Sequence, residues 1–224
     1  MADIADVLTR PDGLNLANAS PPVQLALTLG LTALLPAALM AVTCFTRVII
    51  VLSFARQGLG TQNVPPNQVL IGLAMFLSLF IMQPTINEID RTALQPYLNK
   101  TLSGPLAIQK AADIHKQFLL KHTRKQDLTL FLHLSKTTVN TPEETPFLTL
   151  VPAFMISELK TAFIMGFCIY LPFLMVDLVV SSVLTAMGMV MMPPVTISAP
   201  FKILLFVLAD GWHMVVHAVA SSYG

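Results

Sequence analysis

Charge is the scarcest property of this sequence. Only 11% of its 224 residues are Asp, Glu, Lys or Arg, while 54% are hydrophobic, and an average soluble domain has about 25% charged residues. The formal net charge is +1 and the basic residues are scattered, so the chain lacks the basic surface that nucleic acid requires. The composition predicts a membrane protein and no nucleic-acid partner.

Cysteine is rare, and the signatures of catalysis are missing. Cys44 and Cys168 lie in apolar runs without a Cys-x-x-Cys spacing, so we expect each to be a buried thiol and not a disulfide or metal ligand. There is no Gly-x-Ser-x-Gly, His-Glu-x-x-His or phosphate-loop motif. His213 and His217 are one helical turn apart but have no third ligand nearby. We predict a protein that is not an enzyme and binds neither cofactor nor metal.

The N-terminal segment, residues 1–20, differs from a secretion signal. It carries three aspartates and a single basic residue, Arg10, whereas the start of a signal peptide is positively charged. No small-residue cleavage pattern follows the first apolar run. We therefore expect a polar N-terminal segment, with the chain from Leu25 onward retained.

Four apolar segments, in two pairs, make up most of the chain. In residues 21–84, the run from Val23 to Phe45 exceeds the ~20 residues that cross a bilayer. The second run, Val69 to Met82, has fourteen residues before Gln83-Pro84, which we expect to end it. Because this is short for a span, both a hairpin buried against protein and a separate transmembrane helix remain open. With the second pair in residues 147–224, the pattern predicts an all-α membrane protein of two helical hairpins.

A polar insertion, residues 85–146, separates the hairpins. After Gly104-Pro105, apolar residues recur at helical spacing from Ala107 to Phe118, which predicts an amphipathic helix, and Leu128 with Phe131 indicates a second. We expect its three histidines to lie on a solvated face. They are His115, His122 and His133.

The positions of Lys and Arg indicate an orientation. Arg47 and Arg56 predict that the connection within the first hairpin is cytoplasmic, which places the 85–146 insertion outside the cytoplasm. The insertion contains eight Lys and Arg residues, against the usual bias. Only cations near the ends of membrane segments count strongly, and most of these eight lie far from one.

Five ionisable residues interrupt the second pair of apolar segments. Such groups are costly in hydrocarbon and face protein or water there. Glu158 and Lys160 are two residues apart and do not face each other on a helix. One interpretation is a proton or ion relay; the other, which we favour because no chain of His and carboxylates is visible, is a set of structural ties between subunits or among these residues. The five are Glu158, Lys160, Asp177, Lys202 and Asp210.

A methionine-rich loop, residues 187–194, joins the last two apolar segments. It holds four of the twelve methionines, and its two prolines lack N–H donors and are expected to end a helix arriving from Ser181. Methionine makes a deformable apolar surface. The loop is interpreted either as ordinary core filler or as a soft constriction in a pore. The residues concerned are Met189, Met191 and Met192 at the constriction, with Gly188, Pro193 and Pro194 defining the loop.

Six motifs follow one another along the chain: Cys44 to Arg47, Pro65 to Leu73, Ser157 to Phe163, Leu171 to Leu174, Met187 to Pro194, and Pro200 to Lys202 with Asp210 to Trp212. In this order they resemble those of the FliP and SctR family, which forms the export gate of type III secretion. The flagellar branch fits better, through Pro65-Pro66-Asn67-Gln68. The family's three consecutive methionines are here Met189-Val190-Met191, so one position departs, with Met192 available to replace it.

The resemblance implies a subunit of a protein-export channel. In that family five copies assemble with the FliQ and FliR subunits into a ring or cone-shaped helical channel, and the methionine loop is the gasket that closes the pore. It further implies FlhB and FlhA as partners, unfolded flagellar proteins as substrates, and a multi-pass location in the inner membrane at the flagellar basal body. The rival from another class is a small proton-coupled secondary transporter, in which Glu158, Asp177 or Asp210 carries protons.

Overall fold

The computed structural model describes residues 20–61, 63–189 and 191–224. The predicted polar N-terminal segment, apart from Ser20, therefore lies outside the described residues, as does Val190 of the methionine loop. The described residues form helices and connecting loops without strands, which confirms the predicted all-α fold class. Contacts divide the chain into two compact units, residues 1–40 and 41–224, and each is described by itself.

The first unit contains most of helix α2 (Pro21–Val42), which is apolar and has no buried residue. The helix begins where expected, because the amides of Val23 and Gln24 donate to the carbonyl of Ser20. The hydroxyls of Thr28 and Thr32 donate to carbonyls one turn earlier in the same helix. A helix that satisfies its own polar groups and is apolar on every side is suited to lipid.

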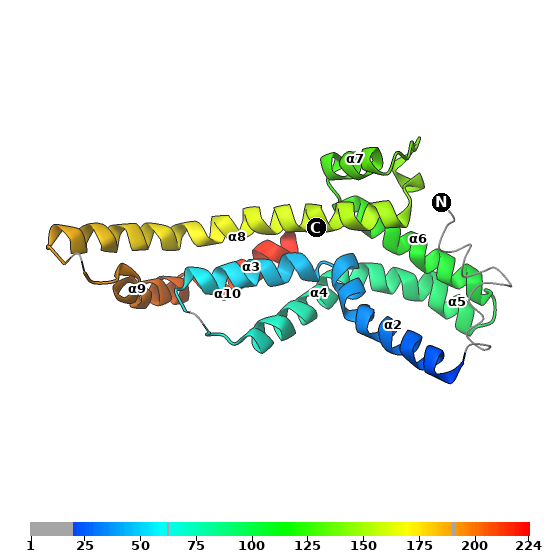
Figure 1. The fold of residues 1–224 in the computed structure, drawn as a ribbon, viewed down its shortest axis with the longest axis horizontal. Coiled ribbons are helices and arrows are strands. Elements are labelled where there is room, and N and C mark those ends of the chain that lie inside the picture. The colour runs from blue at the N-terminus through cyan, green and yellow to red at the C-terminus, as the bar shows by residue number, and fades with distance from the viewer. Residues whose placement is uncertain (1–19, 62, 190) are drawn as a thin grey trace. The chain divides into compact units, whose positions relative to one another are not determined.

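Helix α3 (Phe45–Gly58) is the central helix of the second unit. It starts after a break at Thr43 and Cys44 and packs against α4 (Asn67–Ile89) and α8 (Phe147–Ala186) (Figure 1). Its residues dominate the larger hydrophobic core: Val48, Val51, Leu52 and Ala55 are fully buried. The hairpin partner of α4 is thus this short helix, and not the longer run from Val23 that we expected.

Helix α4 continues through Pro84, so the prediction that Gln83-Pro84 ends it is wrong. It runs to Ile89 and passes through a π-helical turn, η2 (Asp90–Leu94), into α5 (Gln95–Leu98). A proline removes one backbone hydrogen bond, whereas ending the helix in an apolar setting would leave several groups unsatisfied. The resulting stretch of 32 residues is long and apolar enough to cross a membrane.

The insertion forms the two helices that its periodicity predicts. They are α6 (Gly104–His122) and α7 (Lys125–Leu134), followed by a short 3-10 turn, η3 (Pro142–Glu144). Both helices pack against α8, and α6 also packs against α4. The expected solvated face is wrong for two of the three histidines, because His115 and His122 are partly buried, with the ring of Phe118 close to both.

Helix α8 is a single helix of 40 residues, although Pro152 and Pro172 lie inside it. It runs alongside α3, and α9 (Pro194–Leu208) packs near its C-terminal end (Figure 1). A bend of 63° then separates α9 from α10 (Gly211–Ser221). Asp210 occupies this bend with a positive φ of 49°.

Two glycines allow α3 and α8 to approach closely. A Cβ on Gly166 of α8 would lie 2.4 Å from the ring of Phe54 on α3, and a Cβ on Gly58 of α3 would lie 2.4 Å from the ring of Phe173 on α8. The ring of Phe54 on α3 therefore packs on Gly166 of α8, and the ring of Phe173 on α8 packs on Gly58 of α3. This reciprocal packing fixes the register of the two helices, because any larger residue would displace a ring.

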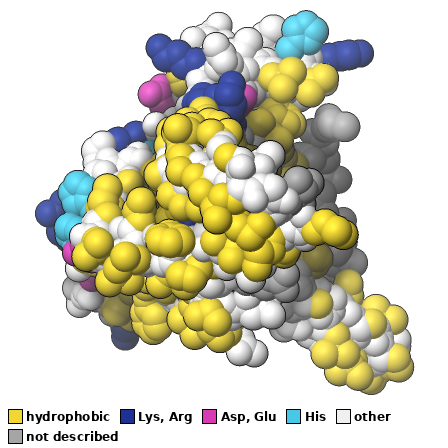
Figure 2. All heavy atoms as spheres, turned by 90° about the vertical axis from the view of Figure 1, so that its left-hand side faces the viewer, with side chains coloured by type: hydrophobic (Ala, Val, Ile, Leu, Met, Phe, Trp, Pro, Cys, Tyr) yellow, Lys and Arg dark blue, Asp and Glu magenta, His cyan; other side chains and the backbone are white. Residues whose placement is uncertain are grey.

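Hydrophobic side chains cover much of the second unit. Figure 2 shows them gathered over the end where α8 meets α9, and large apolar residues such as Leu178, Val183, Val207 and Leu208 are more than half exposed there. The described residues include three helices long and apolar enough to cross a membrane, or four if α9 and α10 count as one bent span. Such a surface is typical of a membrane protein.

Candidate functional site

The methionine loop begins where Gly188 ends helix α8. Gly188 has a φ of +78°, which an L side chain rarely adopts. The amide of Gly188 donates to the carbonyl of Thr185, and that of Met189 donates to the carbonyl of Leu184, both over 3.0 Å. These two bonds form a Schellman motif. The double proline therefore does not end α8 as expected; Pro193 caps α9, and Pro194 is its first residue.

The loop methionines are exposed in the single chain. Met191 is 99% exposed and Met189, the most shielded of the four, is 36% exposed. They are therefore not part of this chain's hydrophobic core. Beside the loop, α8 and α9 line an apolar groove of about 940 Å³ whose walls include Val183, Met187 and Phe201. The pore constriction stays a prediction, and it requires other copies of the chain around the loop.

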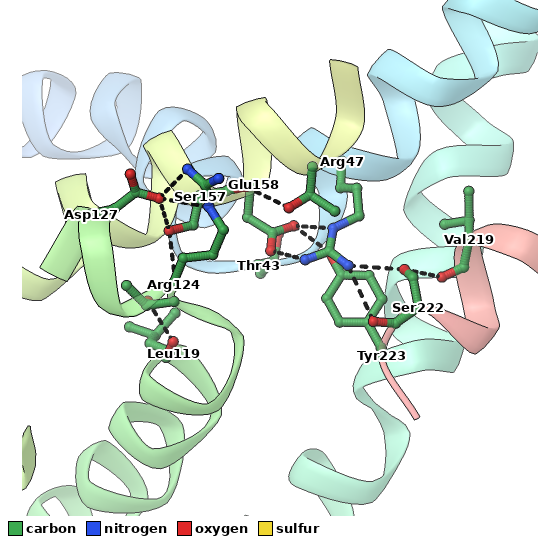
Figure 3. A network of polar contacts seen from close by, with 12 residues as sticks. Thr43, Arg47, Leu119, Arg124, Asp127, Ser157, Glu158, Val219, Ser222 and Tyr223 are labelled. Carbon is green, nitrogen blue, oxygen red and sulfur yellow. Dashed lines mark hydrogen bonds and ion pairs between the residues drawn. The ribbon is translucent and has the colours of Figure 1, made fainter. Parts of the chain in front are cut away.

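A buried ion pair joins α3 to α8. Arg47 is 4% exposed and Glu158 is 0% exposed, and the two form a bidentate contact, with Arg47 Nε 3.0 Å from Glu158 Oε2 (Figure 3). Tyr223 donates its hydroxyl hydrogen to the same carboxylate. The guanidinium also donates to Ser222 and lies 3.8 Å from the centre of the Tyr223 ring. Arg47, Glu158 and Tyr223 therefore satisfy one another inside the protein.

A second polar centre lies beside the first. Ser157 of α8 donates to Asp127 of α7 over 2.7 Å and accepts the backbone amide hydrogen of Arg124 over 3.0 Å (Figure 3). The Arg124 guanidinium lies 2.6 Å from the same carboxylate. Burial by itself would raise the pKa of Asp127, but the hydrogen bonds from Ser157 and Arg124 and the charge of Arg124 outweigh it, so its pKa is lowered. This centre fastens the insertion to α8.

A third polar centre joins α8 to α9. Lys202 Nζ lies 2.6 Å from Asp177 Oδ2, and Ser198 donates to the other carboxylate oxygen. Lys202 and Ser198 are almost fully buried, while the carboxylate is 24% exposed. Asp177 therefore does not interrupt α8, because its charge is neutralised on the facing helix.

The remaining predicted charges are not in buried pairs. Lys160 is exposed and makes no ion pair within the described ranges. Asp210 is exposed, 4.0 Å from His213. Of the five predicted residues, the structure brings together only Asp177 and Lys202. It pairs Glu158 with Arg47, which we had used only to infer orientation, and Arg47 is too buried to act as a surface topology signal.

Sequence reasoning missed several members of these centres. Arg47 was detectable, since it is a lone cation within an apolar run and therefore needs a buried counter-charge. The others, Ser157, Asp127 and Tyr223, carry no such signal, because a single hydroxyl or carboxylate in a polar context is common. The prediction of two buried thiols is right for Cys44 and wrong for Cys168, which is exposed. Cys44 donates to the carbonyl of Ser78, and burial raises its pKa to about 11.

These features define the class of the protein. The described residues form apolar helices that can cross a membrane, and they hold three of the charges inside those helices against opposite charges. The chain is an α-helical membrane protein with an exposed, methionine-rich loop between α8 and α9.

Comparison with known proteins identifies the family. The profile of the FliP family matches residues 28–219. The chain is 53% identical to the flagellar biosynthetic protein FliP of Bacillus subtilis over 209 residues, which is 92% of this chain and 94% of that protein. It is 48% identical to the proteins of the same name from Aquifex aeolicus, over 90% of this chain and 85% of that one, and Pectobacterium carotovorum, over 90% and 78%. The chain belongs to the FliP family.

Proposed function

We propose that the chain is a pore-forming subunit of the flagellar type III protein export gate, which passes unfolded flagellar proteins across the inner membrane at the basal body. The proposal is supported by membership of the FliP family, whose compared members are named for flagellar biosynthesis, and by the apolar helices. We also propose that the 85–146 insertion lies outside the cytoplasm; with Arg47 buried, this orientation rests on Arg56 in the connection within the first hairpin.

The observation that carries the pore role is the exposure of the methionine loop. Several copies around one axis would bring Met189, Met191 and Met192 from each chain into a ring. Apolar constrictions close by expelling water, and flexible methionine side chains can yield to a chain that pushes through. The left-handed Gly188 and the rigid Pro193-Pro194 step hold the two ends of the loop, so the side chains move while the backbone stays anchored.

The apolar groove between α8 and α9 supports assembly with further copies. Contiguous exposed apolar surfaces mark contacts with protein or lipid, and this groove lies next to the loop that would line the pore. We propose an assembly of five copies with FliQ and FliR, in contact with FlhB and FlhA.

The proton-coupled transporter is not favoured. A proton carrier must exchange between a charged and a neutral form, yet Glu158 and Asp177 are each held by a cation and a hydroxyl group. Asp210, the third candidate, is exposed beside His213 and has no continuing chain of carboxylates on the described helices.

Mass spectrometry of the detergent-extracted complex tests the assignment. We expect five copies of the chain together with other small membrane proteins. A monomer or dimer that transports a solute after reconstitution would end the export-gate proposal. As a matched functional readout, cells that lack the chain should fail to secrete flagellar proteins and should recover secretion when it is restored.

A further inference from the structure

Two helical arms carry the methionine loop. One arm is the C-terminal part of α8, residues 177–186, and the other is the N-terminal part of α9, residues 194–202 (Figure 1). The third polar centre joins the arms through Asp177 on α8 and through Ser198 and Lys202 on α9. Over the described part of the chain, no other ion pair or side-chain hydrogen bond connects α8 with α9.

Apolar packing contributes little to holding the arms together. The α8 arm buries only Leu184 among the described residues, and the α9 arm buries only Ser198 and Lys202. Apolar side chains of both helices, such as Val183 and Phe201, instead line the groove of about 940 Å³ and are more than half exposed. A helix is ordinarily held by its apolar face. Here the polar centre holds the α9 arm against α8.

An aromatic contact forms the base from which both arms extend. Phe206 of α9 packs against Phe173 of α8, with ring centroids 6.1 Å apart, and both rings are almost fully buried. Both residues belong to the larger hydrophobic core, where Phe173 lies over Gly58 of α3. Because a closely packed core resists displacement, this contact is a fixed pivot for the arms.

The ammonium group of Lys202 is enclosed on two sides. Its Nζ lies 2.6 Å from Asp177 Oδ2. A Cβ on Gly60, in the connection between α3 and α4, would lie 3.8 Å from the same nitrogen. Lys202 is 2% exposed, so moving Asp177 away would leave a buried charge unpaired. The length of this ion pair therefore sets the separation of the two arms.

The distance from pivot to loop magnifies any change at the polar centre. At about 1.5 Å per residue, Asp177 lies about 6 Å beyond Phe173 along α8, and Met187 lies about 21 Å beyond it. A change of about 1 Å in separation at Asp177 therefore becomes about 3.5 Å at the loop. This exceeds the diameter of a water molecule, about 2.8 Å, and an apolar constriction closes only while it excludes water.

We infer that Asp177, Ser198 and Lys202 are positioning residues of the gasket: they set the separation of the two arms and with it the width of the closed methionine constriction. The inference rests on the proposed function, since it needs the loops of several copies to form a ring. Ser198 donates to the second carboxylate oxygen of Asp177. Both oxygens are thus engaged, and the carboxylate is held in one orientation towards Lys202.

Asp177→Glu distinguishes this positioning role from simple neutralisation of charge. Glutamate keeps the charge that Lys202 needs, but its additional methylene moves the carboxylate about 1.5 Å further from the backbone. We expect the complex, purified with its other subunits, to keep its oligomer yield and to secrete, because no buried charge is left unpaired. Its ion conductance in reconstituted membranes should rise to that of the variant in which Met189, Met191 and Met192 are all replaced by Ala.

Three further variants control this measurement. Asp113→Glu adds the same methylene to an exposed carboxylate on α6 and should leave the complex ion-tight. Ser198→Ala removes one bond to the Asp177 carboxylate and retains the ion pair, so it should leak ions. Ser198→Thr retains the hydroxyl and should not leak. If Asp177→Glu does not assemble, the two Ser198 variants test the inference in its place.

The outcomes separate this inference from the proposed function. An ion-tight Asp177→Glu complex beside a leaky methionine triple variant would overturn the positioning role and leave the export gate standing. An ion-tight triple variant would overturn the gasket and the positioning role together. Equal leakage of Ser198→Ala and Ser198→Thr, or leakage only where the oligomer is lost, would assign the polar centre to stability alone.

Discussion

Ser157 and Glu158 are consecutive on α8 and belong to two different polar centres. Ser157 bonds to Asp127 and Arg124 of the insertion, and Glu158 bonds to Arg47 of α3 and to Tyr223. Successive side chains on a helix point about 100° apart. One turn of α8 therefore binds the insertion on one side and α3 with the C-terminal Tyr223 on the other. This turn also contains Lys160, whose side chain is exposed.

Removal of the loop methionines tests the gasket. The triple variant Met189→Ala, Met191→Ala and Met192→Ala should assemble normally, because these side chains are exposed in the chain, but it should make the membrane leaky to small ions and slow growth. Conductance across reconstituted membranes and oligomer yield are the measurements. A stable, ion-tight variant would contradict the gasket. A variant that does not assemble would instead assign these methionines to packing contacts between copies, because a Met→Ala change at a site buried in the assembly costs about 2–5 kcal/mol.

Glu158→Ala should reduce the recovered amount of folded oligomer. It leaves Arg47 buried without its counter-charge, and a buried pair broken on one side costs about 3–5 kcal/mol. The measurement is oligomer yield after detergent extraction, with Lys160→Ala as control, because Lys160 is exposed on the same turn. An intact oligomer that no longer secretes would instead indicate a relay.

A double variant of the Asp177–Lys202 pair distinguishes a structural ion pair from a proton or ion relay. Asp177→Asn alone should lower thermal stability, because Lys202 stays buried. Asp177→Asn combined with Lys202→Met should regain much of that stability, since no uncompensated charge remains. Secretion should recover with it if the pair is a tie. Recovery of stability without secretion would contradict the tie.

Gly166→Val should weaken the packing of α3 against α8. The added Cβ meets the ring of Phe54 at 2.4 Å, and overpacking of this kind costs about 1–3 kcal/mol. The melting temperature of the detergent-solubilised chain measures the effect. Gly72→Val is the control, because a Cβ at Gly72 meets nothing within 4 Å. Equal melting temperatures for the two variants would refute the close approach.

The lowered pKa of His122 predicts an acid-sensitive fold. The ordinary pKa is 6.5, and burial with the charges of Arg47 and Lys121 lowers it to about 4 in the folded chain. As pH falls from 6.5 towards 4, the unfolded chain binds a proton and the folded chain does not, so stability present above pH 6.5 is lost. Melting temperatures measured from pH 7 to pH 4.5 should fall less for His122→Gln than for the unchanged chain. His133→Gln, at an exposed position, should melt like the unchanged chain at every pH.

The sequence predicted the elements better than their ends and their partners. Composition and periodicity placed the apolar segments and the two insertion helices, because each depends on local pattern. The prediction from Pro84 was wrong because the proline lies inside α4, where an apolar setting favours continued backbone hydrogen bonding. The sequence could not predict that Glu158 pairs with Arg47, because the two residues are 111 positions apart in the chain. An isolated charge does not indicate which opposite charge it contacts in the fold.

Helix α8 makes the two ends of the second unit mechanically dependent. At 1.5 Å per residue, its 40 residues extend about 60 Å, from the part fastened to α6 and α7 to the residue that precedes the methionine loop. A helix of this length transmits motion from one end to the other as a stiff element. It bends most easily where Pro152 and Pro172 each remove a backbone hydrogen bond. A displacement of the insertion therefore tilts α8 and moves the methionine loop at its C-terminal end. The flexibility of α8 at Pro172 determines how much of this tilt reaches the methionines.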